Sequence, residues 1–283
     1  MKLGVMGFIL QRYLESRGHA SPGSLDALFK AAAELGVQSL ELGLHHADRQ
    51  EFVDRVGELK EQYGIGIELG YGPIVREDKA FESANQFVDA FESFVETVCK
   101  SLGVTCIGVV APFHGGRWLR QPSLEEQLER LIDGLSLLVP VAEKFGVYIG
   151  IENHADYRGS ELVQVIEGIG SRSVGVKFDT GNTYCAIEEP LTTAEAVAKY
   201  TVMTHIKDVI VEAEPCNRGL PGGLLALTEC PLGQGHVDLP AIVSMLAANN
   251  PRGDDLVLTI ECQPNHLEAS VEWAKQHFAP MLG

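Results

Sequence analysis

Residues 123–152 read SLEEQLERLIDGLSLLVPVAEKFGVYIGIE and contain one complete unit of a helix followed by a strand. Ser123 is a residue type that commonly begins helices, and the segment after it is amphipathic. Gly146 stands where a helix is expected to end, and the β-rich run VYIGI follows it directly. The order of helix, Leu-Gly-Val or Phe-Gly-Val, and strand also occurs at Leu35 and Leu102. This repetition predicts consecutive βα units and a parallel sheet.

Short β-rich runs alternate with amphipathic segments along the whole chain. The expected strands are 3–7, 38–43, 65–69, 105–110, 147–151, 173–178, 202–206 and 256–260, and the expected helices are 24–35, 49–62, 80–102, 123–145, 160–169, 191–199, 239–248 and 266–279. Eight strands in this order predict the α/β class, with a single (β/α)8 TIM barrel as one domain over residues 1–283. That fold needs about 250 residues.

The segment 208–238 is rich in Gly and Pro and is longer than an ordinary loop between a strand and a helix. Long loops inside compact domains often serve function, so we expect this one to form a partial lid. A passive loop, or one that contacts another subunit, is the alternative.

The composition excludes several classes of partner. The net charge of −17 repels polyanions such as nucleic acids. The longest apolar stretches have the length of strands and fall far short of the roughly 20 residues of a membrane span. Six cysteines without Cys-x-x-Cys spacing, and no secretory leader before MKLGVMGF, favour a reduced cytoplasmic location.

Four ionisable residues stand at the ends of four successive apolar runs. Glu152, Asp179, His205 and Glu261 occur in GVYIGIENH, VGVKFDTGN, YTVMTHIKD and DLVLTIECQ. The carboxyl ends of barrel strands share one mouth, so the four side chains are expected to converge, where a shared cation would offset the cost of burying them. Three carboxylates and one imidazole suit Mn²⁺, our first choice, and also Mg²⁺, Co²⁺ or Zn²⁺. The pattern predicts a metalloenzyme with one divalent ion.

The chain resembles the xylose-isomerase-like TIM-barrel superfamily of sugar isomerases and epimerases over nearly its whole length. The similar motifs are IENHAD around Glu152, KFDTGN around Asp179, HIKD around His205, PLGQGHVDLPAI at 231–242 and TIEC around Glu261. The resemblance implies that these four residues hold one Mn²⁺, Mg²⁺, Co²⁺ or Zn²⁺ ion, and that Glu152 and Glu261 also act as acid and base. Such a site suits removal of a proton next to the carbonyl of a keto-sugar.

Further side chains are expected around this centre. By strand alternation, Lys207 shares a side of its strand with His205, where an ammonium could stabilise an enolate, bind a substrate carboxylate or donate a proton. A purely structural salt bridge is the alternative for Lys207. Substrate contacts are expected from His45, His114, His154 and Trp118, with His46 and Glu68 as further candidates.

Three functions remain open at this point. The first is an isomerase or epimerase of a small keto-sugar, and the second is a lyase that dehydrates or decarboxylates a keto-sugar or its acid through the same enediolate. The third is a carbohydrate-binding barrel without catalysis. Endonucleases of related fold carry a histidine three residues after the aspartate of the sixth strand, where this chain has Asn182. The expected partner is a small carbohydrate, and a homo-oligomer is left open.

Overall fold

Eight parallel strands close into one barrel in the computed structural model, which describes residues 1–43, 50–73, 84–111, 116–214 and 224–283. Around the barrel the order is β1–β10–β7–β6–β5–β4–β3–β2, so β1 pairs with both β2 and β10. These strands are β1 (Lys2–Met6), β2 (Ser39–Gly43), β3 (Gly66–Pro73), β4 (Cys106–Val110), β5 (Tyr148–Glu152), β6 (Val174–Asp179), β7 (Thr201–Ile206) and β10 (Val257–Ile260). The closed parallel sheet confirms the predicted fold class.

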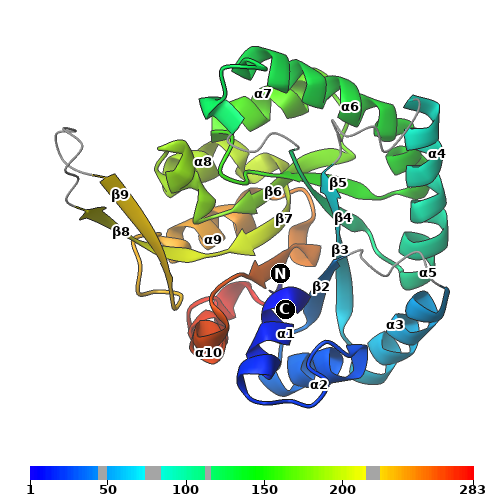
Figure 1. The fold of residues 1–283 in the computed structure, drawn as a ribbon, viewed down its shortest axis with the longest axis vertical. Helices are drawn as coiled ribbons and strands as arrows, with labels where there is room; N and C mark the ends of the chain where they lie inside the picture. The colour runs from blue at the N-terminus through cyan, green and yellow to red at the C-terminus, as the bar shows by residue number, and fades with distance from the viewer. Residues whose placement is uncertain (44–49, 74–83, 112–115, 215–223) are drawn as a thin grey trace.

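Helices surround the barrel (Figure 1). They are α1 (Gly7–Ser16), α2 (Leu25–Leu35), α3 (Gln50–Tyr63), α4 (Ala84–Phe94), α5 (Lys100–Leu102), α6 (Leu124–Phe145), α7 (Gly159–Ile169), α8 (Pro190–Val197), α9 (Leu239–Asn249) and α10 (Leu267–His277), with a π-helix at Val95–Cys99 between α4 and α5. The predicted start of α6 is confirmed, because Ser123 and Glu126 form a reciprocal capping box. Gly146 ends that helix at φ 67°, a left-handed conformation that glycine adopts without steric cost.

Helix α1 was not among the expected helices. It begins directly after β1, and Met6 precedes it without a side-chain hydrogen bond that caps the helix. Neither a turn nor a capping residue therefore separates the strand from the helix in the sequence.

The segment expected as a long loop contains regular structure. Strands β8 (Asp208–Glu214) and β9 (Leu224–Cys230) pair antiparallel, with Asp208 opposite Cys230. The hairpin extends outward from the barrel (Figure 1). The long connection between β7 and α9 is thus partly a hairpin, because DVIVEAE and LLALTEC satisfy their backbone groups by pairing with each other. Its role as a partial lid stays a prediction.

The first and last residues lie side by side, near the start of β1 (Figure 1). The Met1 amino group donates to the Met281 carbonyl at 2.8 Å, and the Gly283 amide donates to the Met1 carbonyl at 2.9 Å. Within the described ranges, none of the helices combines the length and the apolar character that crossing a bilayer requires.

Candidate metal centre

The four predicted ligands meet at the carboxyl ends of their strands. One ligand atom from each of Glu152, Asp179, His205 and Glu261 can be chosen so that all four atoms lie within 4.8 Å of one another. Glu152 and Asp179 are the last residues of β5 and β6, His205 lies on β7, and Glu261 directly follows β10. These strands are neighbours in the barrel, so the convergence follows from the order β10–β7–β6–β5.

Backbone N–H groups hold one carboxylate oxygen of Asp179, and the other oxygen faces the centre. Its Oδ1 accepts from the amides of Gly181 and Asn182 at 2.9 and 3.0 Å. The Asn153 side chain forms two 2.8 Å hydrogen bonds with the backbone N–H and carbonyl of Asp179. The Oδ2 atom is buried and has no partner in hydrogen-bond geometry, although a lysine ammonium lies 3.0 Å away. An oxygen held in this way could ligate a cation.

His205 presents one ring nitrogen to the carboxylates of the centre. Its Nδ1 lies 2.7 Å from Glu261 Oε2, 3.5 Å from Glu152 Oε1 and 3.9 Å from Asp179 Oδ2. This nitrogen too is buried and lacks a partner in hydrogen-bond geometry. Asp179 Oδ2 and His205 Nδ1 are thus two buried atoms without hydrogen-bond partners, 3.9 Å apart and surrounded by carboxylates. A cation bound between them would satisfy both.

Lys207 lies beside the same oxygens. Its Nζ is 2.7 Å from Glu261 Oε1, 3.0 Å from Asp179 Oδ2 and 3.1 Å from Asn182 Oδ1. A Cβ added to Gly181 would lie 2.9 Å from the Lys207 stem, so this glycine leaves room for the lysine. The ammonium is therefore within reach of any molecule that binds between Asp179 and Glu261.

Charges in and beneath the centre nearly balance. Four carboxylates, two lysines and one histidine touch one another there, namely Glu41, Glu152, Asp179, Glu261, Lys177, Lys207 and His205. With the imidazole protonated, the cluster carries one net negative charge. A divalent ion in place of the imidazole proton would bring it to neutrality, so the donor set and its charge fit such an ion.

The pKa values of the centre follow from burial opposed by neighbouring charges. Burial and Lys177 lower the pKa of His205, but the surrounding carboxylates raise it well above the ordinary value. Burial raises the pKa of Asp179 to about 6, against the opposing effect of Lys207. Burial also acts to raise the pKa of Glu261, but His205 and Lys207 lower it to about 2. The pKa of Glu152 lies below its ordinary range because His205 and Lys177 outweigh its burial.

The predicted substrate contacts are only partly described. His45 and His114, like His46, lie outside the described residues. His154 is exposed two residues beyond Glu152, and Trp118 is 58% exposed, with the Arg117 guanidinium 5.6 Å from its ring centre. Their contact with substrate stays a prediction.

Glu68 does not point into the mouth as a free carboxylate. It is buried, and Arg252, which precedes β10, donates to its Oε1 at 2.8 Å. Arg252 also donates to the carbonyl of Val202, near the start of β7. The candidate substrate contact at Glu68 was therefore wrong, because an arginine from the amino-terminal end of the barrel already binds this side chain.

Asp208, beside Lys207, organises the turn at residues 231–238 through its two carboxylate oxygens. Its Oδ1 accepts from the amides of Val209 and Val237, and its Oδ2 accepts from the amides of Gly233 and Gly235, at 2.9–3.2 Å. A Cβ at Gly235 would lie 2.1 Å from Asp208 Oδ1. The motif PLGQGHVD therefore folds around a buried carboxylate.

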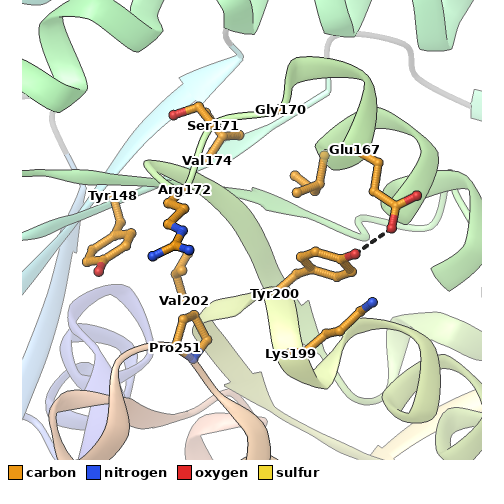
Figure 2. Close-up of a pocket in the computed structure, with 11 residues that line it drawn as sticks. Tyr148, Glu167, Gly170, Ser171, Arg172, Val174, Lys199, Tyr200, Val202 and Pro251 are labelled. Carbon is orange, nitrogen blue, oxygen red and sulfur yellow. Dashed lines mark hydrogen bonds between the residues drawn. The ribbon is translucent and has the colours of Figure 1, made fainter.

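A cavity of about 600 Å³ lies at the other end of the strands (Figure 2). Tyr148 and Val174, which begin β5 and β6, line it together with Arg172 and Tyr200. On one side of the cavity, the Tyr200 hydroxyl donates a hydrogen bond to Glu167 at 2.5 Å. Because strand starts and strand ends lie at opposite ends of a parallel barrel, this cavity is separate from the candidate metal centre.

Comparison with known proteins identifies the same fold. The family described as xylose isomerase-like TIM barrel matches residues 29–277. Uncharacterized protein YihM of Escherichia coli is 26% identical over 133 residues, which cover 47% of this chain and 38% of that protein. The 3-oxo-isoapionate decarboxylase of Pectobacterium atrosepticum is 26% identical over 123 residues, covering 44% of this chain and 43% of the decarboxylase. The matched stretch thus spans less than half the length of either relative.

Solved structures of low sequence identity share the whole barrel. The IOLI protein with a bound zinc atom has a TM-score of 0.69 at 20% identity, over 100% of this chain and 98% of the other. An L-ribulose 3-epimerase has a TM-score of 0.70 at 16% identity, over 99% and 95%. A xylose isomerase-like TIM barrel protein from Mycobacterium smegmatis in complex with magnesium has a TM-score of 0.70 at 14% identity, over 90% and 88%. At these identities the likeness demonstrates a common fold.

Proposed function

The chain belongs to the xylose isomerase-like TIM barrel family, and from this premise we propose that it is a divalent-metal-dependent isomerase or epimerase of a small keto-sugar or related ketone. The reaction removes a proton from the carbon next to a carbonyl and leaves its electron pair in an enediolate. The proton then returns to the other face of the same carbon or to the neighbouring carbon. The L-ribulose 3-epimerase among the structural neighbours supports this reaction class.

One observation supports the proposal most strongly. Asp179 Oδ2 and His205 Nδ1 are buried without hydrogen-bond partners, and both face the carboxylates of Glu152 and Glu261. In the proposal these four residues hold the ion, with Mn²⁺ as the first choice. A bound divalent ion would polarise the carbonyl and hydroxyl oxygens of the substrate and stabilise the negative charge of an enediolate.

The residues of the chain supply the proton transfers. The lowered pKa values of Glu152 and Glu261 keep both carboxylates ionised, which is the form that accepts a proton. The Glu261 side chain is 20% exposed and that of Glu152 is 4% exposed, so Glu261 is the more accessible base. Lys207, which lies 2.7 Å from Glu261, is placed to donate a hydrogen bond to a substrate oxygen that becomes negative.

A lyase is the second candidate, and Lys207 together with the decarboxylase relative favours it. In a dehydration, the electron pair of the enediolate forms a new carbon–carbon double bond as the next C–O bond breaks, and the leaving hydroxide takes the proton that the base removed and departs as water. In a decarboxylation, the bond to the carboxylate breaks as CO₂ leaves, and the electron pair remains as an enolate that is then protonated. The Lys207 ammonium would bind the substrate carboxylate or the enolate oxygen in either case.

A substrate screen in D₂O distinguishes these reactions. The protein with Mn²⁺ is incubated with free keto-sugars and keto-sugar acids, and the products are followed by ¹H and ¹³C NMR. Deuterium on the carbon next to the carbonyl, together with an isomeric sugar, supports the isomerase. Water elimination or released CO₂ supports the lyase. If no compound reacts faster than it does with Mn²⁺ alone, the enzymatic proposal fails.

Metal analysis tests the centre itself. Asp179→Ala and His205→Ala are each expected to lose the bound ion, because each removes one ligand. His154→Ala is the matched control, since this exposed histidine makes no described bond to the four ligands. Stoichiometric ion in both ligand variants would contradict the assignment.

A further inference from the structure

Two charged side chains that strand patterns do not identify lie directly against the candidate ligands. Glu41 lies on β2 and Lys177 on β6, and both are buried inside the barrel. Lys177 Nζ is 2.7 Å from Glu41 Oε1 and 3.2 Å from Glu152 Oε2. Glu41 Oε2 is 2.8 Å from His205 Nε2. Glu41 therefore touches one ligand directly and is joined to a second through Lys177.

The contact with Glu41 decides which ring nitrogen of His205 faces the centre. A carboxylate accepts hydrogen bonds and does not donate them, so Nε2 must carry the hydrogen that Glu41 receives. The neutral imidazole then has its lone pair on Nδ1. This is the nitrogen that lies 2.7 Å from Glu261 and 3.5 Å from Glu152.

Lys177 makes the carboxylate at position 41 hard to replace. The two oxygens of Glu41 each face a different donor, the ammonium of Lys177 and the Nε2–H of His205. A glutamine there has one oxygen and one NH₂ group, so one of the two donors would face another donor. Only a carboxylate satisfies both without moving them.

Two glycines on neighbouring strands leave space inside the barrel for the Lys177 side chain. A Cβ at Gly108 on β4 would lie 2.9 Å from Lys177 Cδ and 3.1 Å from its Nζ. A Cβ at Gly150 on β5 would lie 3.3 Å from Lys177 Cβ. Glycines therefore stand on β4 and β5 where the Lys177 side chain crosses the barrel interior. The buried ammonium is paired with two carboxylates, which offset the cost of its burial.

We propose that Glu41 is a positioning residue of the metal centre: anchored by Lys177, it holds His205 in the tautomer and orientation that present Nδ1 to the ion. This inference rests on the proposed metal centre. Glu41 does not touch the reacting atoms, and it acts through His205. Residues that orient metal-bound histidines in other sites change metal affinity by about 10- to 100-fold when they are replaced.

The test uses metal binding without substrate. Affinity for Co²⁺ is measured by calorimetry and by the visible absorption of the bound ion, for the wild type, Glu41→Gln and Glu68→Gln. Glu68 is the matched control because it is also a buried glutamate, pairs in register with Glu41 on the next strand, and binds Arg252. We expect Glu41→Gln to raise the Kd by about 10- to 100-fold and to alter the Co²⁺ spectrum. Glu68→Gln is expected to change neither.

A second measurement needs no variant. In the Zn²⁺-loaded wild type with ¹⁵N-labelled histidine, the His205 signals are expected to place hydrogen on Nε2 and the ion on Nδ1. Hydrogen on Nδ1 would overturn the inference, even if Glu41→Gln fails to fold. Equal Co²⁺ affinity in wild type and Glu41→Gln would also overturn it. If the wild type binds no stoichiometric ion, the proposed metal centre fails and this inference fails with it.

Discussion

Metal affinity is expected to rise steeply with pH, because the ion and protons compete for the same atoms. In the metal-free protein the pKa of His205 is raised well above its ordinary value by the surrounding carboxylates, so Nδ1 holds a proton at neutral pH. Binding of the ion must release that proton. Each proton released changes the apparent affinity about tenfold per pH unit, or about 1.4 kcal/mol.

A second proton enters the competition in mild acid. Burial raises the pKa of Asp179 to about 6, so below that pH its carboxyl must also lose a proton before it can bind the ion. We therefore expect about a tenfold gain in affinity between pH 6.5 and 7.5, and a gain approaching 100-fold per unit below pH 6. The sign is the same for both groups, since each raised pKa extends the protonated, non-binding form to higher pH.

Calorimetry in buffers of different ionisation enthalpy counts these protons directly. At pH 7.5 the expected number released is about one per ion, and at pH 5.5 it approaches two. His154→Ala should release the same number, which would exclude the exposed histidine as the source. An affinity that does not change between pH 6.5 and 7.5, with no proton released, would refute this account of the centre.

Four other outcomes are expected. Glu152→Gln and Glu261→Gln should lower kcat by about 100-fold or more while the fold is kept, with metal content measured alongside; near-normal turnover in both would move the proton transfer to other groups. Lys207→Met should lower kcat/KM for an acidic substrate by about 10- to 150-fold, as expected for loss of a charged hydrogen bond of about 1.5–3 kcal/mol, and should act more mildly and mainly on kcat for a neutral sugar. Chelation should abolish activity but leave the helical circular dichroism intact at room temperature, because a chain of this size buries enough apolar surface to fold without a metal ion. Unfolding on chelation would contradict this. Asp208→Ala should lower the free energy of unfolding, measured in urea, by about 2–4 kcal/mol, since four backbone N–H groups lose their acceptor. Asp208→Asn should lose less stability because its amide oxygen still accepts hydrogen bonds. A loss below about 1 kcal/mol in the alanine variant would show that water replaces the carboxylate.

The barrel and the four candidate ligands could be predicted from local sequence. Apolar strand runs, helix starts such as Ser123 and helix ends such as Gly146 are read within a few residues, and the structure confirms the closed parallel barrel. In a parallel barrel all strand ends share one mouth. Placing Asp179 and His205 together therefore required only their positions at the ends of their strands.

Other features were decided by tertiary contacts between distant segments. Glu41 and Lys177 are 136 residues apart in the chain, and Arg252 binds a glutamate 184 residues before it. Single charged residues in apolar strands do not reveal their partners, because partner choice depends on the barrel register and on the space left by glycines such as Gly108. The glycines at positions 108 and 150 were a local sign in the sequence that a large side chain crosses the barrel interior at this level.

The sequence by itself thus determined the architecture and the residue types that meet at its mouth, because periodicity and strand ends are local properties. Only the tertiary structure decided which nitrogen of His205 faces the centre and that Glu41 and Lys177 lie against the candidate ligands. It also decided that Glu68 is bound by Arg252 and so is not free for a ligand. The physical reason is that hydrogen-bond partners and charge balance depend on distances of about 3 Å between residues far apart in the chain, which no local pattern encodes.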